Sequence, residues 1–245
     1  KQGLLDRVRV KLAYLTDHGR NIEAPQLEAL QPGMRRVLDI GCGGGGFVAT
    51  LKAEGRELYG IDPDPRSKAA AVARGVTVYE GTAENLPDAV RGQTFDLVIF
   101  SHALEHCPDP ALAIRNACSL VAPGGKFYCV VPNCGSIYFQ TFAEISEILD
   151  VPRHLNFFTP DALKNLLEAN GFETESWVFN GYTRHFLPGW RAWENQIRQQ
   201  LVDHGGGAHA PRRTWLTDLG LLLRTAFAPP ARKYDCVGLI AHPRR

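Results

Sequence analysis

Strand-like and helix-like segments alternate along much of this chain, and this alternation constrains the fold more than any other feature. Short, mostly apolar runs predict strands at residues 36–40, 57–62, 76–80, 95–100 and 126–132. Helices are expected between them at residues 47–55, 65–74 and 110–121. Regular β-α alternation is typical of a parallel sheet with helices on both faces. The run FDLVIF at 95–100 is nearly all apolar, as expected for a strand buried on both sides.

The remaining segments complete a single α/β domain, for which 245 residues are sufficient. Apolar positions at helical spacing predict an amphipathic helix over residues 4–15. A further helix is expected after Thr159 and before Gly171, followed by two more strands. The expected parts are an N-terminal helical cap (1–32), a cofactor-binding core (33–180), a helical lid insertion (181–233) and a last strand with its tail (234–245).

Charge and cysteine usage exclude several classes of protein. The formal net charge is +1, and no basic patch studded with aromatic residues is present, so no nucleic-acid partner is expected. The six cysteines form no Cys-x-x-Cys pair, which favours free thiols in a reducing, cytoplasmic setting. No signal peptide and no apolar run of roughly 20 residues are evident. The chain begins at Lys1 rather than Met, so we expect the natural N-terminus to precede it.

A glycine-rich turn follows the first predicted strand. VLDIGCGGGGF places Asp39 near the end of the strand and then Gly41 and Gly43–Gly46 before a helix. Glycines let the backbone turn tightly and let a ligand lie against the main chain, while the helix N-terminus presents free N–H groups. The turn also satisfies G-x-G-x-x-G, and Asp62 at the end of the next strand can accept hydrogen bonds from ribose hydroxyls. An adenosyl cofactor and a dinucleotide both match these features.

Asp39 discriminates between the two cofactors. Its carboxylate would repel a pyrophosphate, whereas it would attract the ammonium group of a methionine moiety. The turn is therefore predicted to hold S-adenosyl-L-methionine (SAM), with the demethylated product SAH, in preference to a nicotinamide dinucleotide. A turn with no ligand is the least favoured interpretation, since five glycines and two placed acids are more than a turn requires.

Several motifs together resemble class I SAM-dependent methyltransferases. They are VLDIGCGGGGF, YGIDPDP (59–65), GTAENLP (81–87), FDLVIFSHALEHCPDP (95–110), LVAPGGKFYCVVPN (120–133) and HLNFFTPDALKNLLEANGF (154–172). The run Leu-Glu-His-Cys-Pro-Asp-Pro is similar to one in the ubiquinone-biosynthesis O-methyltransferases. The resemblance covers residues 33 to 180 and implies a Rossmann-like, seven-stranded, mostly parallel sheet with an antiparallel last strand.

The resemblance also implies a set of cofactor-binding residues. They are Asp39, Gly41, Cys42, Gly43, Asp62, Pro63, Thr82, Ala83, Glu84, Ser101 and His102. Asp39, Gly41 and Gly43 would line the methionine end, and Asp62 would hold the ribose. Pro63 and Ala83 would flank the adenine. Many relatives carry Asp where this chain has Thr82, so a weaker hydrogen bond to the adenine amino group is expected there.

Residues 102–106 spell H-x-x-E-H, which is the inverted zinc-protease signature. On a long helix, both histidines would lie on one face. Pro108 follows closely, however, and the segment leaves a buried strand directly, so no metal site is expected. Glu105 is expected to fix the loop by accepting hydrogen bonds from backbone N–H groups.

Methyl transfer to a hydroxyl benefits from a general base, and histidine is the usual choice. His154 is the first candidate for this catalytic role, followed by His102 and then His106. Oxygen is the favoured acceptor atom, in a phenol or quinone precursor, a sugar or a carboxylate. Methylation of a small amine is the alternative and needs no base. The other classes considered are an NAD(P)-dependent oxidoreductase and a non-catalytic SAM-binding partner subunit.

The acceptor, a small molecule, is expected to bind under a lid formed by the N-terminal helix, residues 134–158 and the insertion. Aromatic side chains are frequent there, and most are expected to pack the lid onto the sheet. Leu216–Phe227 is amphipathic to apolar and is suited to contact with a membrane, a partner or another copy. From the sequence, core or homodimer packing is favoured over peripheral membrane contact.

Overall fold

The computed structural model describes residues 3–17, 27, 33–206 and 208–244, which divide between two compact units. We call residues 23–131, 160–178 and 238–245 the sheet unit, and residues 1–22, 132–159 and 179–237 the helical unit. Residues 18–26 and 28–32 of the expected N-terminal cap lie outside the described residues. The expectation of one domain over residues 1–245 stays a prediction.

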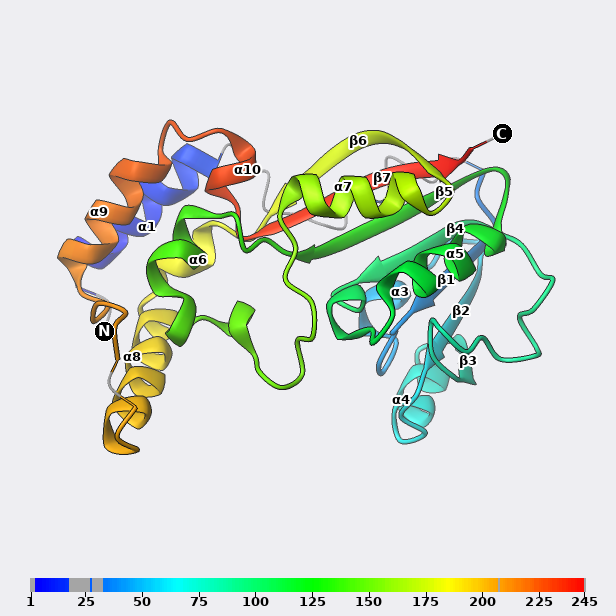
Figure 1. Ribbon diagram of the computed structural model, residues 1–245, viewed down its shortest axis with the longest axis horizontal. Helices are drawn as coiled ribbons and strands as arrows, with labels where there is room; N and C mark the ends of the chain where they lie inside the picture. The colour runs from blue at the N-terminus through cyan, green and yellow to red at the C-terminus, as the bar shows by residue number, and fades with distance from the viewer. Residues whose placement is uncertain (1–2, 18–26, 28–32, 207, 245) are drawn as a thin grey trace. The chain divides into compact units, whose positions relative to one another are not determined.

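A sheet with the strand order β3-β2-β1-β4-β5-β7-β6 forms the centre of the sheet unit (Figure 1). Its strands are β1 (Arg36–Ile40), β2 (Glu57–Asp62), β3 (Val76–Glu80), β4 (Phe95–Ser101), β5 (Val121–Pro132), β6 (Phe172–Asn180) and β7 (Cys236–Pro243). The pairs β1–β2, β1–β4, β2–β3 and β4–β5 are parallel. The β7 arrow runs opposite to that of β5 in Figure 1. The predicted Rossmann-like, mostly parallel sheet of seven strands is confirmed in the part of the chain that the structure describes.

The apolar runs form the core of the sheet, as expected. Leu97–Phe100 in β4 and Phe127–Val131 in β5 are completely buried. The helices of this unit are α3 (Gly46–Ala49), α4 (Ser67–Ala73), α5 (Pro110–Leu120) and α7 (Pro160–Ala169), together with the 3₁₀ turn η1 (Leu104–His106). Helix α7 buries Leu163 and Leu167, and the Phe127 and Phe172 rings stack with 4.4 Å between their centroids.

Two boundaries differ from the sequence prediction by more than two residues. Helix α3 ends at Ala49 rather than continuing to Gly55, because Thr50 and Leu51 donate to carbonyls only three residues back and tighten the last turn. Strand β5 begins at Val121 rather than at residue 126. Its partner β4 pairs Phe95 with Val121 but Leu97 with Lys126, so residues 122–125 bulge out of the ladder. Pro123-Gly124-Gly125 thus interrupts the ladder and does not precede it.

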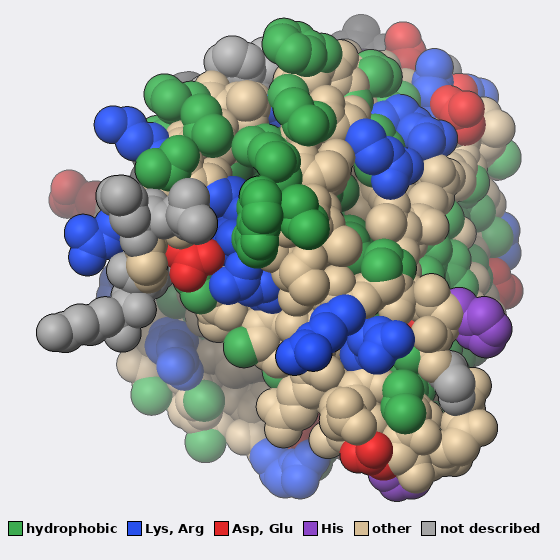
Figure 2. All heavy atoms as spheres, turned by 90° about the vertical axis from the view of Figure 1, so that its left-hand side faces the viewer, with side chains coloured by type: hydrophobic (Ala, Val, Ile, Leu, Met, Phe, Trp, Pro, Cys, Tyr) green, Lys and Arg blue, Asp and Glu red, His purple; other side chains and the backbone are tan. Residues whose placement is uncertain are grey.

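The helical unit contains most of the remaining helices. They are α1 (Leu4–Asp17), α6 (Ile137–Phe142), η2 (Ala143–Ile145), η3 (Glu147–Leu149), η4 (Thr183–Phe186), α8 (Pro188–Asp203), α9 (Trp215–Thr225) and α10 (Pro230–Lys233). The expected helix at 4–15 and the helical nature of the 181–233 insertion are both confirmed. None of the helices in the described ranges has both the length and the apolar character that crossing a membrane requires. Figure 2 shows hydrophobic side chains gathered on one face, with Lys and Arg side chains beside them.

A buried ionic cluster holds the helical unit together. The Arg213 side chain is completely buried and forms ion pairs with Glu194 and Asp218. Its Nη2 also donates to the His185 carbonyl at 2.7 Å. Burial raises the pKa of Glu194 to about 7, against the opposing effect of the nearby Arg213 charge. Removal of the guanidinium would leave the buried Glu194 carboxylate without a cation, whereas Asp218 would keep its ion pairs with Arg9 and Arg191.

We expect Arg213→Ala to lower the free energy of unfolding by about 3–5 kcal/mol, because a broken buried ion pair leaves uncompensated charge. Urea unfolding followed by circular dichroism measures this loss. The matched control is Arg212→Ala, which removes an exposed arginine and should cost less than about 0.5 kcal/mol. Equal losses in the two variants would contradict a structural role for the cluster.

Candidate functional site

The glycine turn follows the carboxyl end of β1 and is hydrogen-bonded to the carboxyl end of β2. The backbone N–H groups of Gly41 and Cys42 both donate to the Ile61 carbonyl, at 2.8 and 3.2 Å. Gly41 has φ +80°, and a Cβ there would lie 2.5 Å from the Ala103 Cβ. Only glycine satisfies both conditions, because an L side chain would be strained in this conformation and would also collide with the loop after β4. The turn is thereby held against that loop.

Asp62 fastens the turn from the end of β2. Its Oδ2 accepts from the Gly43 backbone N–H at 2.7 Å. Its Oδ1 accepts from the Asp64 N–H at 2.9 Å and from the Ser67 hydroxyl at 3.2 Å. A carboxylate offers about four acceptor positions, so capacity for a ligand hydroxyl is left. Ser67 was not identified from the sequence, since a serine at the start of a helix is usually a cap.

Asp39 is a buried acid beside the turn. Its side chain is 2% exposed, and its Oδ1 has no hydrogen-bond partner within the described residues. Burial, assisted by the negative charge of Asp62, raises the pKa of Asp39 to about 8. A buried acceptor without a donor is costly, and a cationic ligand group would relieve that cost. These residues therefore match a ligand that has both an ammonium group and a ribose hydroxyl, as SAM does.

Cys42 and Pro63 complete the predicted residues around the turn. The Cys42 Sγ packs over β2, where a Cβ on Gly60 would lie 2.3 Å from it. Burial, followed by the charges of Asp39 and Asp62, raises the Cys42 pKa to about 12, so the thiol stays protonated at neutral pH. The Cys42 side chain therefore carries no charge beside the turn. Pro63 is exposed, immediately after Asp62.

The predicted adenine-side loop is also held next to Asp62. Gly81 N–H donates to the Asp62 carbonyl at 3.2 Å, and the Thr82 hydroxyl accepts from Asn85 N–H at 3.0 Å. Asn116 on α5 donates to the carbonyls of Ala83 and Glu84 at 2.8 and 3.0 Å. Asn116 gave no sequence signal, because one polar residue on a helix is ordinary. The Thr82 hydroxyl is thus already engaged in shaping the loop.

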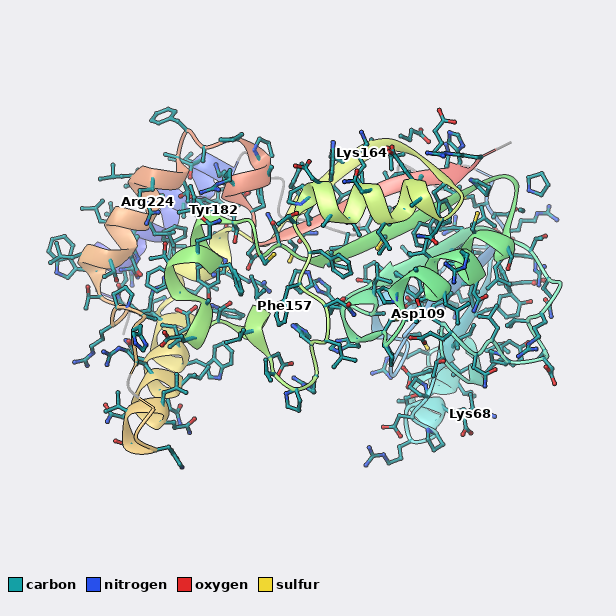
Figure 3. All side chains as sticks on the ribbon, in the orientation of Figure 1. Lys68, Asp109, Phe157, Lys164, Tyr182 and Arg224 are labelled. Carbon is teal, nitrogen blue, oxygen red and sulfur yellow. The ribbon has the colours of Figure 1, made fainter. Side chains whose placement is uncertain are left out.

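Helix α5 begins beside this loop. Asp109, labelled in Figure 3, caps the helix by accepting from the Leu112 N–H at 2.9 Å. The Asp109 N–H in turn lies 3.4 Å from Glu84 Oε1. Glu84 therefore faces the start of α5, and its side chain contributes to the loop structure.

The segment after β4 departs from regular structure at His102. This residue has φ +54°, a left-handed conformation that non-glycine residues rarely adopt. Only the three residues Leu104–His106 are helical, so the long helix of an inverted zinc-protease site is not formed. Ser101 is half-buried at the end of the strand. Strained backbone of this kind is frequent at functional sites.

The hydrogen bonds predicted for Glu105 are absent among the described residues. It is 1% exposed, and neither carboxylate oxygen accepts a hydrogen bond from any described residue. It does not fix the loop through backbone N–H groups, because the short η1 turn directs those groups elsewhere. The His102 Nδ1 lies 3.5 Å from Glu105 Oε1, which is an electrostatic contact when His102 is protonated.

The three candidate bases are distributed between the units. His102 and His106 are exposed residues of the sheet unit, whereas His154 belongs to the helical unit. His154 Nδ1 lies 2.8 Å from the Ile148 carbonyl, which can only accept. Nδ1 therefore carries the proton in neutral His154, and Nε2 carries the basic lone pair. Which histidine acts as a base stays a prediction.

Comparison with known proteins identifies the family. Residues 13–176 match the methyltransferase domain family, and the chain belongs to this family. It is a SAM-dependent methyltransferase. The match ends before the helical insertion at 181–233.

Individual relatives add detail. The ubiquinone biosynthesis O-methyltransferase of Methylobacterium sp. (strain 4-46) is 35% identical over 179 residues, covering 66% of this chain and 70% of the relative. A Thermotoga maritima structure, described as a possible histamine N-methyltransferase, is 20% identical with a TM-score of 0.58, covering 97% of this chain and 92% of that one. A Geobacter sulfurreducens methyltransferase, solved with S-adenosyl-L-homocysteine, is 17% identical with a TM-score of 0.53, covering 96% and 98%. The two structures support the fold alone.

We expect Asp39→Asn to stabilise the ligand-free protein at neutral and higher pH. The carboxyl has an ordinary pKa of 3.8 and a native pKa of about 8, so between these values the native state retains a proton that the unfolded chain has lost. Stability therefore falls as pH rises through this window, and Asn removes that dependence. At about pH 8 the variant should gain about 1–3 kcal/mol over the wild type, with a smaller gain at about pH 5.

Urea unfolding at both pH values measures the effect. The matched control is Asp88→Asn, whose carboxylate is 97% exposed and should leave the pH dependence unchanged. The same gain in both variants, or a gain that does not grow with pH, would contradict a raised pKa at Asp39.

Proposed function

We propose that this methyltransferase transfers the methyl group of SAM to an oxygen atom of a small-molecule acceptor, with the cofactor bound at the carboxyl ends of β1, β2 and β4. The observation that carries the proposal is the buried, unpartnered Asp39 oxygen beside a glycine turn that Asp62 fastens. A buried acid with an unpaired oxygen beside a glycine turn suits the ammonium group of a methionine moiety.

The proposed roles follow from the positions of the residues. Asp39 orients the ammonium group, the backbone of Gly41–Gly43 lies along the methionine chain, and Asp62 accepts from the ribose. Pro63 and the loop of Thr82, Ala83 and Glu84 flank the adenine. Ser101 and His102 border the methyl-transfer position. When bound, the cofactor supplies a methyl group on a sulfonium that leaves as a neutral thioether, so no acid is needed for the leaving group.

Oxygen is the proposed acceptor atom because curated relatives, including the one from Methylobacterium sp., are named O-methyltransferases. The acceptor hydroxyl forms the new C–O bond as the C–S bond breaks, and its proton passes to a base. A phenol or quinone precursor is the first class to test, followed by sugars and carboxylates. The protein must hold the acceptor oxygen behind the methyl group at about 3 Å.

His154 is the proposed base. The Ile148 carbonyl fixes the Nδ1–H tautomer, so Nε2 is the atom that accepts the acceptor proton. His102 and His106 are the other candidates, in that order. The six free cysteines further support the proposal of a reducing, cytoplasmic setting.

The decisive experiment is calorimetric titration of the purified protein with SAH, and with NAD as a parallel ligand. Micromolar SAH binding without NAD binding is expected. A panel of catechols, sugars, carboxylates and amines then identifies the acceptor by SAH formation. Turnover of amines alone would overturn the oxygen assignment while leaving the cofactor assignment intact.

We expect Asp62→Ala to weaken SAH binding by at least about tenfold, because one hydrogen bond to a charged group is lost at about 1.5–3 kcal/mol. Calorimetry measures the affinity. The matched control is Ser67→Ala, which removes one contact to Asp62 Oδ1 but keeps the carboxylate. Wild-type affinity in Asp62→Ala would remove the ribose contact from the proposal.

We expect His154→Ala to leave SAH affinity nearly unchanged and to lower kcat by about 10²–10⁴-fold, the usual contribution of a general base. The matched variants are His102→Ala and His106→Ala, which should retain more activity. Turnover of each variant is measured with the acceptor found in the panel. Unchanged kcat in His154→Ala, with loss in His102→Ala, would transfer the role to His102.

A further inference from the structure

Helix α9 exposes an apolar stripe to solvent. Its outward side chains, and that of Phe227 just beyond its end, are exposed hydrophobic groups. They are Trp215 (53% exposed), Leu216 (60%), Leu219 (38%), Leu223 (68%) and Phe227 (99%). The spacing places Leu216, Leu219 and Leu223 along one side of the helix, and Phe227 follows just beyond its end. Helix α9 also buries Leu221 and Leu222 on its opposite side, so the exposed stripe is additional to the one that packs the helix into the unit.

Helix α1 lies against α9 and extends the same kind of surface. Val8, Leu12 and Leu15 recur at helical spacing and are 48%, 43% and 58% exposed. Both helices belong to the helical unit. Single exposed apolar residues are ordinary, but a group of this extent on two neighbouring helices indicates a binding surface.

The exposed charges on the two segments that form this surface are all positive. In residues 3–17 and 211–233, as far as the structure describes their side chains, the exposed charged residues are Arg7, Lys11, Arg212, Arg224 and Arg232. Asp17 and Asp218 are completely buried, and Asp6 is half-buried and paired with Arg9 and Arg191. Figure 2 shows Lys and Arg side chains beside the hydrophobic group, and Arg224 is labelled on α9 in Figure 3.

We propose that the exposed face of α1 and α9 binds the surface of an anionic lipid membrane. Trp, Phe and Leu on one side of a helix, flanked by Lys and Arg, are the features of helices that lie in the membrane interface. Apolar side chains enter the boundary of the acyl chains, while cations pair with lipid phosphates. A helix of this kind lies along one surface of the bilayer.

Charge argues against a second copy as the occupant. In a two-fold symmetric dimer the same surface meets itself, so the five cations would face cations with no exposed acid from α1 or from residues 211–233, as far as these are described. Like charges across an interface are unfavourable. These charges therefore favour a membrane over a second copy, whereas the sequence alone favoured core or homodimer packing.

Vesicle co-sedimentation of the full chain tests the proposal, with vesicles of phosphatidylcholine alone and of phosphatidylcholine mixed with phosphatidylglycerol. Binding to the anionic vesicles is expected, and it should weaken with added salt. The double variant Leu223→Ser, Phe227→Ser should bind at least about tenfold more weakly, because it removes two inserted side chains. Arg7→Gln with Lys11→Gln should bind roughly 30-fold more weakly, since each cation contributes about fivefold near such a surface.

The matched controls lie in other parts of the chain. Val72→Ser with Val202→Ser removes two exposed apolar side chains, and Lys52→Gln with Lys68→Gln removes two exposed cations. Both controls should bind vesicles like the wild type, and SAH affinity should be unchanged in all four variants. Absence of sedimentation, equal binding to neutral vesicles, or equal losses in variants and controls would overturn the proposal. A dimer in light scattering that Leu223→Ser, Phe227→Ser dissociates would assign the face to a second copy instead.

Discussion

The carboxylate of Asp62 is the interaction on which the cofactor end of the sheet unit depends. It accepts from Gly43 in the turn after β1, and from Asp64 and Ser67 at the end of β2. The adjoining Asp62 carbonyl accepts from Gly81, where the next loop begins. One residue therefore connects three loops that are far apart in the sequence. Parallel strands bring their carboxyl ends to one edge, and these hydrogen bonds then determine how the loops lie at that edge.

The sequence was most informative where one physical requirement dominated. Strands β1, β2 and β3 begin and end at the predicted residues, because each is a short apolar run between turn residues. The strand-to-bulge transition at 121–126 was missed, since Pro-Gly-Gly is typical of a turn and only pairing with β4 shows that the ladder continues beyond it. The early end of α3 at Ala49 likewise depends on local hydrogen bonds that no periodicity encodes.

The sequence motif predicted which residues meet at the candidate site, but not the hydrogen bonds that support them. Asp39, Gly41, Gly43 and Asp62 meet at the turn, as the motif implies. The supporting residues Ser67 and Asn116 carry no distinctive pattern, because their roles arise from tertiary packing. Glu105 was assigned hydrogen bonds that the structure does not contain, since the short turn around it has too few N–H groups directed at its carboxylate.

Because its pKa is raised, the buried Asp39 carboxyl is protonated at neutral pH in the ligand-free protein. Its Oδ1 has no hydrogen-bond partner within the described residues. On the proposed assignment, the ammonium group of the cofactor takes the place of that proton. Cofactor binding then becomes an exchange of one cation for another at a single oxygen. Acidification competes with the cofactor, and the cofactor displaces a proton into solution each time it enters. On this assignment, cofactor affinity rises as the pH rises toward the pKa of Asp39.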